Sequence, residues 1–195
     1  MFYSFARLLC RIFLLTVRRW KVYGLDNLPA AGGIVVAANH TSYLDPIAIG
    51  CAMRRRVSFM GKAELFRIPV LKSIVVGLGT FPVRRGGVDR EAIRTALRYL
   101  AEGKAIGIFP EGTRSKDGKI HKPQQGAALL ALKADVPIVP VALKGTCGAF
   151  RKVKVAFGEP LSFPEYRGVR PSREVLEAIS DRIMVEIDSM MQRMR

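Results

Sequence analysis

Short apolar segments alternate with amphipathic segments along most of this chain, and this alternation constrains the fold more than any other feature. Residues 33–38, 105–109 and 138–143 are runs of β-branched and small apolar residues, which are typical of strands buried on both faces. Residues 88–101 place apolar side chains at helical spacing, and Gly103 lies just past their end. Strands that alternate with helices predict an α/β fold with a mixed, mostly parallel central sheet flanked by helices.

The remaining segments fit the same alternation. Further strands are expected at residues 57–60, 79–83 and 153–157, and further helices from residue 45 and at residues 64–76, 125–134 and 171–195. The chain has 195 residues, of which 49% are hydrophobic, so it has enough apolar material for one sizeable core and disorder is excluded. No repeat or linker divides it, and the length predicts a single domain.

Residues 1–21 are predicted to form an amphipathic helix that associates with a membrane. Their longest uncharged run has six residues, far fewer than the roughly 20 that a spanning helix needs. At about 100° per residue, Arg7, Arg11 and Arg18 fall in one narrow sector, while bulky apolar side chains cover much of the rest. These arginines, together with Arg19, would bind anionic headgroups while the apolar side enters the bilayer interface. The alternative is that this helix packs on its own domain.

The charge and the cysteine count limit the partners. Thirty-two Lys and Arg residues stand against 16 Asp and Glu residues, a net charge of +16 that favours anionic partners such as a membrane surface, a phosphorylated substrate or a nucleic acid. The single tryptophan and the lack of interleaved aromatic and basic residues argue against nucleic acid. Three scattered cysteines and two histidines predict neither a disulfide framework nor a metal site, and they favour a reducing compartment.

His40 is the strongest candidate for a general base. It directly follows a predicted strand, and α/β sheets bind their ligands beyond the carboxyl ends of strands. A strand that ends at Asn39 and a helix that starts at Asp45 supply the turn that would bring His40 and Asp45 together. Asp45 would then hold one imidazole nitrogen and leave the other as a base. The alternative is that Asp45, followed by Pro46, is only a helix cap and His40 a hydrogen-bonded turn residue.

Two further clusters follow other predicted strands. Residues 110–115 place Gly112, which permits a tight turn, before Arg114, whose guanidinium suits a phosphate. Residues 79–84 end in a second arginine, Arg84. Since the carboxyl ends of parallel strands share one edge, the three clusters can converge on one phosphorylated ligand. No nucleophile motif of the Gly-x-Ser-x-Gly type is present, which indicates direct attack by a substrate hydroxyl.

Four motifs in this order resemble those of the glycerolipid acyltransferase family, and within it the 1-acyl-sn-glycerol-3-phosphate acyltransferases. They are Asn-His-x-x-x-x-Asp at residues 39–45, an apolar strand ending in arginine at residues 79–84, Pro-Glu-Gly-Thr-Arg-Ser at residues 110–115 and Val-Pro-Ile-Val-Pro-Val at residues 136–141. The resemblance extends from about residue 24 to residue 161. It implies that residues 22–195 are the catalytic domain of a glycerolipid acyltransferase.

The resemblance implies transfer of a fatty acyl group from acyl-CoA or an acyl carrier protein to the sn-2 hydroxyl of lysophosphatidic acid, which yields phosphatidic acid for phospholipid biosynthesis. His40 would be the general base and Asp45 its orienting carboxylate, with no metal or other cofactor. Arg84 would bind the phosphate of the acceptor. The acceptor site would be shaped by Glu111, Gly112, Thr113 and Arg114. The backbone from Asn39 to Ser42 is our candidate for the donors that stabilise the oxyanion.

Two alternatives differ in substrate or in kind. The same chemistry can act on another lysophospholipid or on a lyso-ornithine lipid. A non-enzymatic basic module that binds membranes or nucleic acid would explain the charge but not the motifs. The enzymatic interpretation predicts a peripheral, monotopic protein at the cytoplasmic face of the cell membrane. Its partners would be anionic lipids, lysophosphatidic acid and an acyl thioester, and not nucleic acid.

Overall fold

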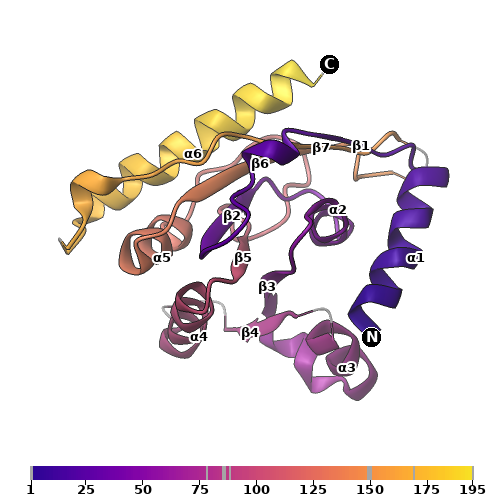
Figure 1. The fold of residues 1–195 in the computed structure, drawn as a ribbon, viewed down its shortest axis with the longest axis horizontal. Helices are drawn as coiled ribbons and strands as arrows, with labels where there is room; N and C mark the ends of the chain where they lie inside the picture. Colours follow the sequence, from indigo (N-terminus) through magenta and orange to yellow (C-terminus); the bar gives the residue numbers. More distant parts are fainter. Residues whose placement is uncertain are drawn as a thin grey trace.

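The computed structural model describes residues 2–77, 79–84, 87, 89–148, 151–168 and 170–194. Within these ranges, a seven-stranded sheet in the order β1-β7-β6-β2-β5-β3-β4 lies between two layers of helices (Figure 1). The strands are β1 (Lys21–Tyr23), β2 (Ile34–Ala38), β3 (Val57–Lys62), β4 (Phe81–Val83), β5 (Ala105–Ile108), β6 (Ile138–Lys144) and β7 (Lys154–Phe157). The α-helices are α1 (Phe2–Thr16), α2 (Asp45–Ala52), α3 (Pro69–Gly77), α4 (Arg90–Ala101), α5 (Gly126–Ala134) and α6 (Arg173–Arg193), with short 3-10 turns at Leu25–Asn27, Ala63–Arg67 and Pro164–Tyr166.

The sheet is mixed and mostly parallel, as predicted. Strands β6, β2, β5, β3 and β4 pair in parallel. Strand β7 runs antiparallel to β6, and β1 pairs in parallel with β7, so these two strands run against the rest. The predicted α/β fold is confirmed, and the predicted helix at residues 64–76 is divided at Pro69 into a 3-10 turn and α3.

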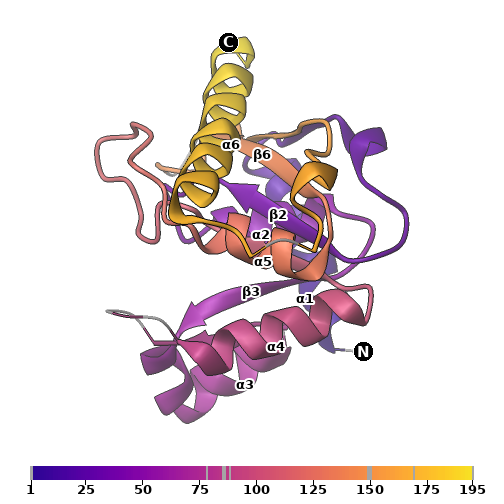
Figure 2. The same ribbon diagram turned by 90° about the vertical axis from the view of Figure 1, so that its left-hand side faces the viewer.

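Strand β2 shows why the central strands read as continuous apolar runs. All five of its residues are buried. Val35 and Ala37 face the layer of α4, α5 and α6, which is turned toward the viewer in Figure 2, whereas Ile34, Val36 and Ala38 face α1 and α2. Because both faces are covered by helices, both sets of alternating side chains are apolar.

The first helix ends earlier than predicted. Helix α1 ends at Thr16, and the backbone turns at Arg19, which has a φ of 45°. Residues Lys21–Tyr23 then form β1, a strand that the sequence did not predict. Its place is set by hydrogen bonds to a distant segment, since Lys21 N donates to the carbonyl of Val153 at 2.9 Å.

The orientation of α1 corrects the expectation for its arginines. Arg7 donates to the carbonyl oxygens of Cys51 and Met53 at the end of α2. Arg18 is only 5% exposed and donates to the carbonyl of Gly145. The large apolar side chains point outward instead, namely Phe5, Leu8, Leu9, Ile12, Phe13 and Leu15. Two of the four arginines assigned to headgroups are therefore bonded inside the protein. In the described part of the chain, no helix has the length and apolar character needed to cross a membrane.

Candidate active site

One edge of the sheet collects the predicted site residues. The parallel strands β2, β4 and β5 end at this edge, and they are followed there by His40, Arg84 and Glu111. Strand β6 also ends there, and because β7 is antiparallel to β6, the turn between these two strands lies at the same edge. The topology therefore brings the three predicted clusters to one side of the molecule.

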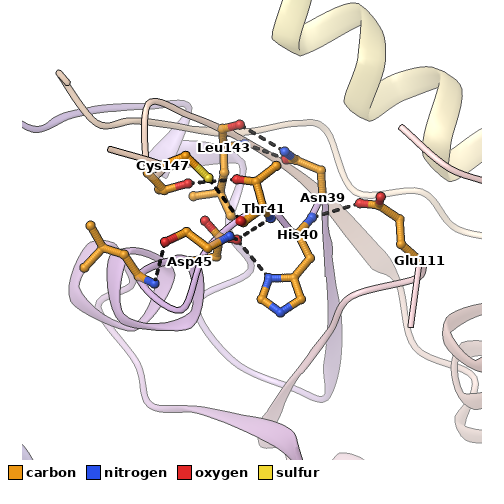
Figure 3. A network of polar contacts seen from close by, with 10 residues as sticks. Asn39, His40, Thr41, Asp45, Glu111, Leu143 and Cys147 are labelled. Carbon is orange, nitrogen blue, oxygen red and sulfur yellow. Dashed lines mark hydrogen bonds and ion pairs between the residues drawn. The ribbon is translucent and has the colours of Figure 1, made fainter. Parts of the chain in front are cut away.

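His40 and Asp45 are in direct contact (Figure 3). His40 Nδ1 lies 2.8 Å from Asp45 Oδ2, and the same oxygen accepts the backbone N–H groups of Thr41 and Ser42, each at 2.7 Å. A carboxylate oxygen only accepts, so Nδ1 carries the proton and Nε2 keeps its lone pair. The Asp45 side chain is fully buried and that of His40 is 14% exposed, so a ligand can reach the ring but not the carboxylate.

The start of α2 differs from the prediction that Asp45 is its N-cap. Leu44 occupies the N-cap position, and Asp45 and Pro46 are the first two helical residues. The Asp45 carboxylate turns back into the preceding loop, where it accepts from Thr41 and Ser42 rather than from the first turn of its own helix. The carboxylate thus serves the loop that carries His40.

Contacts with the end of β6 and the turn after it hold this loop in place (Figure 3). The buried amide of Asn39 forms two hydrogen bonds with the backbone of Leu143: Nδ2 donates to the carbonyl at 3.0 Å, and Oδ1 accepts the N–H at 2.7 Å. Thr41 Oγ1 lies 3.0 Å from Thr146 Oγ1, and Cys147 Sγ donates to the Thr41 carbonyl at 3.0 Å. The end of β6 and the turn after it therefore fix the backbone on both sides of His40.

Glu111, in the loop after β5, binds the main chain of His40. Its Oε1 accepts the backbone N–H of His40 at 2.9 Å, and the backbone N–H of Ser115 donates to the His40 carbonyl at 2.7 Å. Glu111 is only 6% exposed, and within the described residues its Oε2 has no hydrogen-bond partner. Burial raises the pKa of the Glu111 carboxyl, and the hydrogen bond from the His40 N–H opposes this rise. The structure thus places Glu111 under the His40 main chain, whereas the resemblance implied a role in the acceptor site.

The next three residues of this loop, residues 112–114, are exposed. Gly112 has a φ of 68°, which a glycine adopts without strain, and Thr113 and Arg114 follow it at the surface. The Arg114 guanidinium lies 3.7 Å from the centre of the Tyr43 ring and donates to the Tyr43 hydroxyl at 3.0 Å. Tyr43 was not singled out from the sequence, and no pattern there predicts its contact with Arg114.

Arg84 lies after β4 and is exposed. Its backbone N–H donates to Asp89, whose carboxylate also caps α4 through Glu91 and Ala92. This hydrogen bond from Arg84 is the main cause that lowers the pKa of Asp89. Within the described part of the chain, no side-chain hydrogen bond joins Arg84 to the His40 group. The next residue of the motif, Arg85, lies outside the described residues.

An aromatic stack lies against the imidazole. The Phe109 ring is 3.9 Å from the His40 ring, centre to centre, at an angle of 17°. Phe59 in turn stacks on Phe109, with the ring centres 5.6 Å apart at an angle of 13°. A Cβ atom on Gly107 would lie 2.3 Å from the Phe59 ring. The sequence signal for this packing was a glycine inside a strand, which often marks the close approach of another group.

Gly107→Ala is expected to destabilise the fold by about 1–3 kcal/mol, the usual cost of overpacking a core. The added methyl group cannot fit unless the Phe59 ring moves, and this movement would carry into Phe109 and His40. Urea unfolding of both proteins measures the difference. Gly126→Ala, where nothing lies within 4 Å, is the matched control and should not destabilise. Equal stability of Gly107→Ala and wild type would contradict the prediction.

The structure contradicts the predicted oxyanion donors at three of the four residues from Asn39 to Ser42. The backbone N–H groups of His40, Thr41 and Ser42 all have carboxylate acceptors, Glu111 for the first and Asp45 for the other two. These three groups are therefore occupied by the scaffold of the site and cannot turn toward a substrate oxygen. The physical reason is that this loop needs its own donors to hold the two buried carboxylates.

An imidazole with one free nitrogen, fixed by a buried carboxylate at the carboxyl edge of an α/β sheet, is typical of enzymes that deprotonate a hydroxyl. The model of the acyltransferase family matches residues 19–144, and the chain belongs to this family. The predicted family is therefore confirmed, the chain is an acyltransferase, and the non-enzymatic alternative is wrong.

Curated relatives and a solved structure agree with this membership. The 1-acyl-sn-glycerol-3-phosphate acyltransferase of Bacillus subtilis is 34% identical over 167 residues, which are 83% of this chain and 82% of that protein. The protein of the same name from Borreliella burgdorferi is 31% identical over 158 residues, 80% of this chain and 62% of the relative's length. The crystal structure of the 1-acyl-sn-glycerophosphate acyltransferase PlsC from Thermotoga maritima is 26% identical, with a TM-score of 0.69 over 96% of this chain and 82% of that chain.

Proposed function

We propose that this acyltransferase moves a fatty acyl group from acyl-CoA or an acyl carrier protein to the sn-2 hydroxyl of lysophosphatidic acid, and so produces phosphatidic acid. The names of the relatives support the acceptor. The contact between His40 Nδ1 and Asp45 Oδ2 at 2.8 Å supports the mechanism most directly, because it leaves Nε2 ready to accept a proton.

In the proposed reaction, His40 Nε2 takes the proton from the acceptor hydroxyl as its oxygen attacks the thioester carbonyl. The buried Asp45 carboxylate stabilises the imidazolium that forms. When the tetrahedral intermediate collapses, the C–S bond breaks, and the imidazolium returns the proton to the departing sulfur. The products are the acylated acceptor and a free thiol. The thioester is consumed as a co-substrate, and the reaction uses no metal or other cofactor.

The exposed arginines at the same edge would hold the acceptor. Arg114, with Thr113 and Gly112 beside it, follows β5, and Arg84 follows β4, so a phosphate can approach His40 from this side. A guanidinium binds a phosphate through two parallel hydrogen bonds. Glu111 shapes this site from below, since it anchors the His40 backbone.

A matrix of donors and acceptors tests this function. Thiol release should depend on lysophosphatidic acid and should be much slower with a monoacylglycerol, which lacks the phosphate. Arg84→Ala and Arg114→Ala should each raise the KM for lysophosphatidic acid about tenfold or more, and leave the KM for the donor unchanged. Arg193→Ala, at the end of α6, is the control. Equal rates with and without the acceptor phosphate would refute the assignment, and preference for a lyso-ornithine lipid would favour that substrate instead.

The protein is also proposed to lie at the cytoplasmic face of the cell membrane as a peripheral, monotopic protein. The outward apolar row of α1 and the exposed Arg11 and Arg19 support this placement, because they suit an interface that contains anionic lipids. Sedimentation with anionic vesicles should recover the protein. Leu9→Ser should weaken this binding about tenfold or more, whereas Val185→Ser, an exposed residue of α6, should not. Equal binding of the two variants would contradict the role of α1.

A further inference from the structure

Arg18 is a buried cation, and in the described part of the chain it has no acidic partner. It is 5% exposed, and none of the salt bridges among the described residues includes it. Its guanidinium donates to main-chain carbonyls: Nη2 to Gly145 at 2.7 Å and to Thr146 at 3.4 Å, and Nε to Arg151 at 3.1 Å. All three acceptors belong to the connection between β6 and β7. A buried charge persists only where such hydrogen bonds compensate its lost hydration, so this geometry is closely defined.

The turn that Arg18 binds is also the turn that contacts the loop of His40. Thr146 is 3% exposed, its carbonyl accepts from Arg18, and its Oγ1 lies 3.0 Å from Thr41 Oγ1. The next residue, Cys147, donates to the carbonyl of Thr41. Figure 3 shows this residue and Thr41 side by side. Thr41 in turn donates its N–H to the Asp45 oxygen that holds His40.

Helix α1, which ends just before Arg18, has its own contact with the same scaffold. Arg7, near its start, donates to the carbonyls of Cys51 and Met53. These carbonyls end α2, the helix that begins with Asp45. Helix α1 and the segment just after it therefore reach the His40 loop from two directions: Arg18 through the turn after β6, and Arg7 through α2.

We propose that Arg18 is a positioning residue for acyl transfer. It holds the turn of Gly145, Thr146 and Cys147 against Thr41, and this contact keeps the loop of His40 in its reactive geometry. The inference rests on the proposed function, in which His40 is the base. It gives Arg18 a role opposite to headgroup binding, since its charge is directed into the protein.

Two substitutions break the link at different points. Arg18→Met keeps the aliphatic stem but removes every donor, and Thr146→Val removes the hydroxyl contact with Thr41 without changing α1. Each should lower kcat about 10- to 100-fold, since small displacements of a catalytic group have effects of this size. The KM for either substrate should stay within about twofold. Arg151→Met is the matched control, because Arg151 is exposed and contributes only its backbone carbonyl.

The double variant separates positioning from simple stabilisation. If both residues act through one contact, Arg18→Met combined with Thr146→Val should lower kcat no further than the more damaging single change. Activity is measured with lysophosphatidic acid in neutral detergent micelles and divided by the folded fraction from circular dichroism. Arg18→Lys, which can still donate to one or two carbonyls, should recover part of the kcat. If Arg18→Met does not fold, Arg18→Lys and Thr146→Val together test the positioning role.

The failure of this inference differs from the failure of the proposed function. An active His40→Ala would remove the proposed function whatever the Arg18 variants do. An inactive His40→Ala together with unchanged kcat per folded protein in Arg18→Met and Thr146→Val would overturn the positioning role alone. Effects that multiply in the double variant would also overturn it, because the two residues would then act independently.

Discussion

His40→Ala is expected to abolish acyl transfer, with kcat falling by about 10²- to 10⁴-fold, the usual contribution of a general base. The substitution removes the only group in the described site whose free nitrogen is fixed beside the strand ends. Thiol release from the donor in the presence of lysophosphatidic acid measures this loss.

The second histidine of the chain provides the control for this experiment. His121 lies in the loop after β5, about half exposed, with Nε2 3.0 Å from Asp117. His121→Ala removes an imidazole and a carboxylate contact of similar length, yet it should leave kcat near the wild-type value. Comparable losses in the two variants, or full activity of His40→Ala, would refute the proposed mechanism.

Asp45→Asn is expected to lower kcat about 10³-fold or more, with little change in shape. Three donors converge on Asp45 Oδ2, so the amide oxygen takes that place, keeps the hydrogen bonds from His40, Thr41 and Ser42, and the fold should persist. The substitution removes the negative charge that stabilises the imidazolium formed in the proposed reaction. Kinetics and thermal unfolding of the same preparation test both statements.

Asp117→Asn is the matched comparison for Asp45→Asn. Asp117 also contacts a histidine, but it is exposed, and its hydrogen bonds, first with Ser115 Oγ, lower the pKa of its carboxyl to about 2. Its replacement should leave kcat within about twofold, since His121 has no part in the proposed reaction. A small effect of Asp45→Asn, close to that of Asp117→Asn, would mean that the buried carboxylate does not stabilise the imidazolium.

The sequence predicted the sheet and the convergence of its loops because both depend on local patterns. Apolar runs such as residues 34–38 mark strands covered on both faces, and parallel strands bring their carboxyl ends to one edge. The contact of His40 with Asp45 could also be expected, since the turn between them is short. The position of Asp45 inside the helix was missed. Aspartate is favoured at the N-cap, but this preference does not predict the direction in which the carboxylate turns.

The contacts missed from the sequence are those between distant segments. The amphipathic pattern of the first helix could not show that Arg7 and Arg18 bind main-chain carbonyls of the protein while Arg11 stays exposed. The N–H groups of His40 and Thr41 are occupied because the carboxylates of Glu111 and Asp45 turn toward them, and the spacing of residues in the sequence does not predict this. The stack of Phe109 on His40 requires three strands to be placed first.

The pairing of β1 with β7 has a consequence for the order of events during synthesis. Lys21 pairs with Lys154, so the partner strand is synthesised about 130 residues later, which takes roughly 7 to 26 seconds at about 5–20 residues per second. The carbonyl of Gly145, which holds Arg18, is made almost as late. Until then the carboxyl end of α1 lacks its attachment to the sheet, although the exposed apolar residues of this helix have already been synthesised. A nascent chain of this enzyme can therefore contact a bilayer or a chaperone before its catalytic site has formed.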